Sequence, residues 1–197
     1  ENNEGELNIA VPLMRSSCMI PQIMAEFSKK YPNVNVSIWE EAYSIQEKLL
    51  LNDQLDFGIF NETREHPKLE YELLKREEIL LVMPPDHPLA SSGYPSPSDQ
   101  YPRIDLSTLA SEPFILHFPE QTTGKLGLEA LDRAGVQPRV PVRSRNTETC
   151  VKLCMQGMGM CFTPETYLQN MDFSRKPACF SVGEKGIFTT LSIAFRR

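Results

Sequence analysis

The chain has 197 residues, a formal net charge of −6 and five cysteines. A chain of this length buries roughly 70% of the surface that its unfolded form exposes, so it can form a core without disulfides or metals. The acidic balance argues against a nucleic-acid-binding surface, which requires a basic face. No run of 18 apolar residues is present, which excludes a transmembrane helix, and the start lacks the pattern of a secretory signal. Five cysteines without regular spacing fit a reduced, cytoplasmic protein.

The first part of the chain predicts a strand–loop–helix–strand unit. Apolar residues alternate over residues 7–11, as in a strand, and again over residues 34–38. Between them we expect a polar loop over residues 12–17 and a helix over residues 18–30 with one apolar stripe. A loop that joins a strand to a helix N-terminus is where open α/β sheets bind ligands.

The alternation of strands and helices continues along the chain, which favours an α/β fold. Residues 91–105 are rich in Ser and Pro and predict an exposed loop. Gly135 is expected to end a helix in the left-handed conformation. The remaining expected strands are residues 55–59, 69–74, 79–83, 114–116, 140–142, 160–162, 179–182 and 188–195. The remaining expected helices begin near residues 45, 125, 147 and 164, with a loop over residues 122–124 before the second of them. The chain therefore contains two similar α/β halves, with a first crossing between them near residues 75–78.

A series of short motifs, weak singly but specific in their order, resembles the effector-binding domain of LysR-type transcriptional regulators. The resemblance covers nearly the whole chain. The motifs are Leu7–Val11, Pro21, Glu26-Phe27, Tyr31-Pro32, Val34-Asn35-Val36, Leu55-Asp56-Phe57-Gly58-Ile59, His87-Pro88-Leu89-Ala90, Leu109, Pro113-Phe114-Ile115 and Gly157-Met158-Gly159-Met160.

The resemblance implies a type II periplasmic-binding-protein-like fold, in which two Rossmann-like subdomains are joined by two crossover segments. Subdomain I would comprise residues 1–76 and 188–197, and subdomain II residues 77–187, with a hinge and a cleft between them. The family further implies a small-molecule effector and an N-terminal winged helix-turn-helix that this chain lacks, through which alone the protein would bind DNA. It also implies a homodimer or homotetramer, in which the helix around residues 18–30 meets the helix around residues 125–134 of a second copy.

Small polar residues at four strand-to-helix junctions are the main site candidates. Helix N-termini present unpaired N–H groups and a positive dipole end, which favour an anionic ligand, although each residue alone could be an ordinary helix cap. These candidates are Ser16, Ser17, Tyr43, Ser44, Thr122, Thr123, Asn146 and Thr147.

Three further residues complete the predicted ligand site: Leu13, Arg15 and Asn61. Asn61 stands where some relatives of the family have an arginine, so carboxylate binding at that point would need Arg15 or Arg64 in its place. Exposed arginines are usually just solvated.

The cysteines suggest a second hypothesis. Cys18 is expected near a helix N-terminus, where a thiolate is stabilised, which makes it a redox candidate. No clustered His or acidic residues accompany the cysteines, so no metal site is expected, and most of the five are expected to be buried in apolar surroundings.

No enzymatic motif is present, since the chain lacks a G-x-S-x-G elbow, a P-loop and H-E-x-x-H. We therefore expect no catalytic residue and no cofactor. Two alternatives to a regulatory domain remain: a free-standing, exported solute-binding protein, and a thiol-based redox sensor of the same fold.

Overall fold

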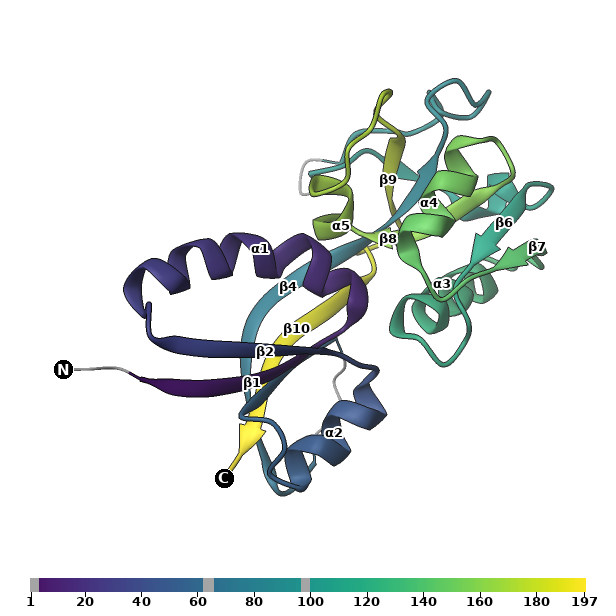
Figure 1. Cartoon of the computed structure of the whole chain (residues 1–197). Helices are drawn as coiled ribbons and strands as arrows, with labels where there is room; N and C mark the ends of the chain where they lie inside the picture. Colours follow the sequence, from purple (N-terminus) through teal and green to yellow (C-terminus); the bar gives the residue numbers. More distant parts are fainter. Residues whose placement is uncertain (1–3, 62–65, 97–99) are drawn as a thin grey trace. The chain divides into compact units, whose positions relative to one another are not determined.

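A computed structural model describes residues 4–61, 66–96 and 100–197. The chain divides into two compact units (Figure 1). Unit 1 comprises Glu1–Arg76 with Thr190–Arg197, and unit 2 comprises Glu77–Thr189. Two long strands, β4 (Leu69–Met83) and β10 (Phe188–Arg196), carry the chain from one unit to the other. No helix in the described part of the chain is long and apolar enough to cross a membrane.

Strand β4 corrects the expectation of two separate strands at residues 69–74 and 79–83. Its 15 residues are continuous through the charged residues 75–78. Directly after the charged residues, the β4 backbone is hydrogen-bonded again, because Ile79 N donates to Ile187 O at 2.7 Å. The charged residues interrupt the apolar pattern without interrupting the strand.

Unit 1 is a sheet with one helix on each face (Figure 1). Its strand order is β2-β1-β3-β10-β4. Strand β1 runs parallel to β2 and β3, and β10 is antiparallel to β3. Ile20 of α1 packs with Ile9 on one face, and Leu50 of α2 packs with Ala10 and Phe60 on the other. The elements are β1 (Gly5–Val11), α1 (Leu13–Lys30), β2 (Val34–Glu40), α2 (Tyr43–Leu51) and β3 (Phe57–Phe60).

Helices α1 and α3 begin earlier than the sequence predicts. The expected loop over residues 12–17 is wrong, because α1 begins at Leu13 directly after Pro12, whose φ of −59° suits a helix entry. Ser16 N donates to Pro12 O at 3.0 Å and closes the first turn. In the same way, α3 begins at Thr122, where a loop over residues 122–124 was expected.

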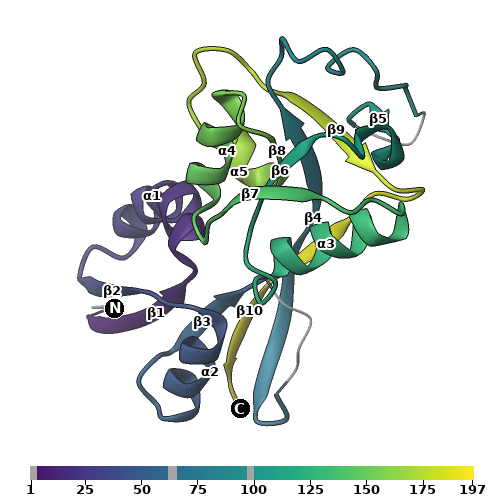
Figure 2. The same cartoon turned by 90° about the vertical axis from the view of Figure 1, so that its right-hand side faces the viewer.

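Unit 2 is a second sheet, with the strand order β4-β8-β6-β7 and with β9 beside β4 (Figure 2). Strand β6 is parallel to β7 and β8, whereas β4 is antiparallel to β8 and β9. Leu131 of α3 packs with Phe114 and Phe162, and Cys154 of α4 packs with Ile115 in a second cluster. The elements are β5 (Arg103–Ile104), η1 (Leu106–Leu109), β6 (Pro113–Leu116), α3 (Thr122–Arg133), β7 (Arg139–Arg143), α4 (Thr147–Met155), β8 (Met160–Pro164), α5 (Glu165–Gln169) and β9 (Ala178–Val182). Gly135 follows α3 with φ +70°, which confirms its predicted role.

The Ser- and Pro-rich residues 91–105 are more ordered than the predicted exposed loop, although residues 97–99 lie outside the described part. Arg103 and Ile104 are buried and form β5, which pairs parallel with β9. Tyr94 and Arg103 are joined by two backbone hydrogen bonds of 2.8 Å, and the Arg103 guanidinium donates to Gly183 O. Short strands of two residues lack a periodicity that a sequence could reveal.

One polar pair lies in the interior of unit 2. His117 follows β6 and is 2% exposed, and its Nε2 lies 3.1 Å from Oγ1 of Thr147, at the start of α4. Burial away from water lowers the pKa of His117 to about 4. The imidazole is therefore neutral at pH 7.

Gly159 lies where unit 2 tolerates no side chain. Its φ is +154°, and a Cβ there would lie 2.7 Å from Pro113 O. We predict that Gly159→Ala lowers the free energy of unfolding by about 2–3 kcal/mol. Gly157→Ala is the matched control, because Gly157 also has a positive φ, +78°, but has open space around it; it should cost about 1 kcal/mol. Urea unfolding followed by circular dichroism measures both, and equal costs would contradict the backbone-contact explanation.

The burial of neutral His117 predicts a loss of stability in mild acid. Above pH 6.5 the imidazole is neutral in both the folded and the unfolded chain. Between pH 6.5 and 4 only the unfolded chain takes up the proton, which lowers the free energy of unfolding by up to about 3 kcal/mol. The free energy of unfolding from urea titrations should be about 2 kcal/mol lower at pH 5.0 than at pH 7.5 because of this protonation. His117→Gln, which does not titrate, should show a smaller loss, and an unchanged loss would refute the assignment to His117.

Candidate functional site

The predicted residues of unit 1 gather around a buried arginine. Arg15 is the third residue of α1, just beyond the carboxyl end of β1, and its side chain is 0% exposed. Its Nε donates to Oδ1 of Asn61 at 3.2 Å, and Asn61 directly follows β3. Because β1 and β3 are parallel neighbours, their carboxyl ends bring these two residues together. Arg64, the other predicted cation, lies outside the described residues.

The other predicted residues of the α1 start differ in their surroundings. Ser16 is buried, whereas Leu13 and Ser17 are exposed. The Ser17 hydroxyl lies 3.4 Å from Leu13 O and donates back into the helix. Ser17 therefore behaves as an ordinary serine of a helix surface.

Tyr43 and Ser44 lie in the first turn of α2, and the Tyr43 side chain contacts both Glu47 and Phe60. Its hydroxyl donates to Oε2 of Glu47 at 2.6 Å, and its ring packs edge-on against Phe60 with the centroids 4.9 Å apart. Desolvation, together with Glu47, raises the pKa of Tyr43. Tyr43 thus stabilises α2 against the sheet.

Gln46 is a buried polar residue that sequence reasoning missed. It is 0% exposed, and its Nε2 donates to Glu41 O at 2.6 Å, which holds the connection between β2 and α2. The signal was present: Gln46 and Leu50 are four residues apart on one helix face, and Leu50 is fully buried. A polar side chain on a buried stripe indicates a specific structural or binding role.

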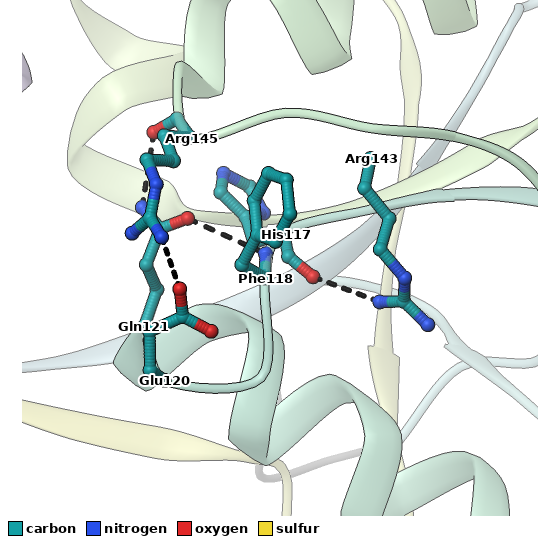
Figure 3. Close-up of polar contacts among 6 residues, drawn as sticks. All are labelled: His117, Phe118, Glu120, Gln121, Arg143 and Arg145. Atoms are coloured by element: carbon teal, nitrogen blue, oxygen red, sulfur yellow. Dashed lines mark hydrogen bonds and ion pairs between the residues drawn. The ribbon is translucent and has the colours of Figure 1, made fainter.

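In unit 2, the two loops that follow β6 and β7 are tied to each other (Figure 3). Arg145 forms an ion pair with Glu120, and its guanidinium lies 4.8 Å from the centre of the Phe118 ring. Gln121 donates through Nε2 to Arg145 O at 3.0 Å, and Arg143 donates to His117 O at 3.1 Å. Hydrogen bonding by the backbone at Glu120 and the Arg145 guanidinium lower the pKa of the Glu120 carboxyl.

These loop contacts surround the His117–Thr147 pair. Thr147 is 6% exposed, and Asn146 caps α4 by accepting from Thr149 N at 3.0 Å. Asn146 is therefore a helix cap, as predicted, while Thr122 and Thr123 lie half-buried in the first turn of α3. The sequence did not single out His117, whose only signal is its place directly after a buried strand.

The structure opposes the chemical basis of the Cys18 hypothesis. Cys18 is the sixth residue of α1, beyond the first turn where the helix dipole acts most strongly. Burial raises the pKa of the Cys18 thiol, an effect that the nearby Arg15 charge only partly offsets. Cys150, Cys154 and Cys161 are fully buried. Among the described residues, no group of three or more His, Cys, Asp or Glu side chains could hold a metal ion.

The geometry provides two kinds of polar chemistry, one in each unit. Unit 1 supplies a buried positive charge beside a neutral amide. Unit 2 supplies the neutral imidazole of His117 and the hydroxyl of Thr147, which lie in the connected loops after β6 and β7. Both groups lie at the carboxyl ends of parallel strands, the usual place for ligands in α/β sheets.

Comparisons with known proteins agree with this architecture. Residues 1–176 match the protein family described as LysR substrate binding domain. The HTH-type transcriptional regulator AlsR of Bacillus subtilis (strain 168) is 27% identical over 149 residues, which are 75% of this chain and 46% of AlsR. The chain spans about half the length of the known regulators that it matches.

Solved structures show the same fold. The CcmR regulatory domain of Synechocystis PCC6803, in complex with 2-PG, has a TM-score of 0.82 and 22% identity, covering 98% of this chain and 88% of that chain. The BenM effector binding domain with its effector benzoate has a TM-score of 0.79 and 18% identity, covering 98% of this chain and 84% of that chain. Both are effector-binding domains of the type II periplasmic-binding-protein-like fold. The match over residues 1–176 shows that this chain belongs to the LysR substrate binding domain family.

Proposed function

We propose that this chain is the ligand-sensing domain of a LysR-type transcriptional regulator that binds a small anionic metabolite beside Arg15. The observation that carries the proposal is the buried Arg15 at the carboxyl end of β1 in a chain of this family. CcmR and BenM, which share the fold, hold the small molecules 2-PG and benzoate. Their example supports a small-molecule effector here.

The anionic character of the effector follows from the surroundings of Arg15. A guanidinium buried away from water gains strongly from a nearby anion, and its planar donors match a carboxylate or a phosphate. The Asn61 amide accepts from Arg15 Nε at 3.2 Å, which holds the guanidinium at the carboxyl ends of β1 and β3. Ser16, which is buried in the same turn, adds a hydroxyl donor.

The proposed regulation is a shift between conformations. An effector that binds one conformation of the domain more tightly than another shifts the population toward that conformation. Because the conformation of the domain and the arrangement of the oligomer are coupled, effector binding changes the geometry of the oligomer on DNA. DNA binding itself is assigned to an N-terminal winged helix-turn-helix outside these 197 residues. The whole protein would act in the cytoplasm, where transcription occurs, and the chain itself would sense rather than catalyse.

We further propose that the domain dimerises through α1 of one copy and α3 of the other. Ile23 on α1 is 48% exposed, which is unusual for a large apolar side chain on a helix. Pro21 and Ala25 on the same helix are also exposed. Small and apolar exposed residues allow a second helix to approach closely.

Asn61→Asp should weaken anion binding while retaining the fold. The new carboxylate keeps the acceptor for Arg15 Nε and adds a negative charge that repels an anion bound beside it. A panel of carboxylate, phosphate and neutral metabolites, including benzoate, is screened by thermal shift and titrated by calorimetry. For the anion that binds the wild-type chain best, we expect affinity to fall about tenfold to a hundredfold, as for loss of a charged hydrogen bond.

Arg139→Gln is the matched control, because Arg139 is an exposed cation on β7. It should leave the affinity unchanged. If Asn61→Asp binds the anion as well as the wild type does, or if only neutral compounds bind the wild-type chain, the proposed role of Arg15 is wrong.

Ile23→Lys should convert dimers into monomers, because a charge would have to be buried at the α1 surface. Sedimentation equilibrium measures the mass. Ile45→Lys on α2 is the control, since Ile45 is 44% exposed but lies outside the proposed interface. A variant Ile23→Lys that remains as dimeric as the wild type would exclude α1 as the interface.

A further inference from the structure

In the strand pairings of the described residues, the part of β4 that belongs to unit 1 is the last strand of its sheet, and it carries exposed leucines. Among the strand pairings of the described residues, β8 and β9 join β4 at residues 79–83. Beside residues 69–76 the neighbouring strand is β10 (Figure 2). Leu73 is 66% exposed and Leu74 is 48% exposed. Edge strands with exposed apolar residues are templates for pairing with another chain.

We propose that residues 69–76 of β4 pair with the same residues of a second copy, as two antiparallel strands related by a two-fold axis. The argument is the order of charges along the strand. Glu70 and Glu72 precede the two leucines, and Lys75 and Arg76 follow them. An antiparallel copy therefore sets the acidic end of one strand beside the basic end of the other, with leucines in the centre.

A two-fold axis normal to the sheet fixes which residues can face each other. Opposite residues must lie on the same face, so their numbers must differ by an even count. With Leu73 on the axis, Leu73 meets Leu73 of the second copy, and Glu70 faces Arg76. Glu72 then lies diagonal to the same Arg76, which places two acids around each arginine.

The same strand placed against itself with Glu72 on the axis would bring two like charges together, which disfavours that register. In the isolated chain Glu70 also accepts from Nε of Arg197 at 3.2 Å, and both side chains are largely exposed, so Glu70 can interact with a further cation. One strand pair buries far less surface than a standard stable interface, so the association is expected to be weak alone. It would join copies through a surface separate from α1.

A charge-exchange experiment tests the pairing in the Ile23→Lys background, which removes the proposed α1 interface. One variant carries Glu70→Arg with Glu72→Arg, so that its strand is basic throughout. The other carries Lys75→Glu with Arg76→Glu, so that its strand is acidic throughout. Each alone should be monomeric in sedimentation equilibrium at several hundred micromolar, and their equimolar mixture should form a one-to-one dimer at least tenfold tighter than either self-association.

The control for general charge attraction mixes the basic variant with Arg139→Glu/Lys152→Glu, also in the Ile23→Lys background, which adds two acids to exposed sites of unit 2. This mixture should remain monomeric. In the same Ile23→Lys background, Leu73→Lys should weaken the remaining self-association at least tenfold, whereas Met158→Lys, at a site 44% exposed, should not. A charge-exchanged mixture that stays monomeric, or one that associates no better than the control mixture, would overturn the proposal.

Discussion

The buried charge of Arg15 is the constraint on which the proposed sensor depends. A guanidinium can be held away from water only if the surrounding structure supplies acceptors. Here β1 ends directly in α1, with Pro12 at the junction, so Arg15 turns inward in the first helical turn. The parallel pairing of β1 with β3 places Asn61 at hydrogen-bonding distance. Backbone topology thus determines where the charge lies.

Unit 2 presents a different chemistry at the corresponding ends of its strands. His117 is held neutral by burial and lies against Thr147, so this pair can offer hydrogen bonds without a charge. The contacts of Arg145 and Gln121 tie the two neighbouring loops together, which limits the movement of the pair (Figure 3).

The sequence predicted the elements better than their junctions. Apolar alternation located β1 and β2, because alternate side chains of a strand lie on opposite faces of the sheet. The start of α1 was missed because Arg15 and Ser16 resemble loop residues, although both are buried in the helix. The continuity of β4 through residues 75–78 was missed for a similar reason, since charged residues broke the pattern. Arg15 and Asn61 were both named as candidates, but their contact depends on strand pairing, which periodicity does not specify. His117 was passed over because a lone histidine carries no spacing signal.

Nuclear magnetic resonance of the arginine side chains tests the central claim most directly. The Nε–Hε resonance of Arg15, assigned through an Arg15→Lys sample, is followed while the best-binding anionic metabolite is titrated into the wild-type chain. If Arg15 holds the anion, this resonance shifts in proportion to the bound fraction, while that of exposed Arg139 stays in place. A saturated complex in which the Arg15 resonance has not moved would show that the charge of the effector is held elsewhere.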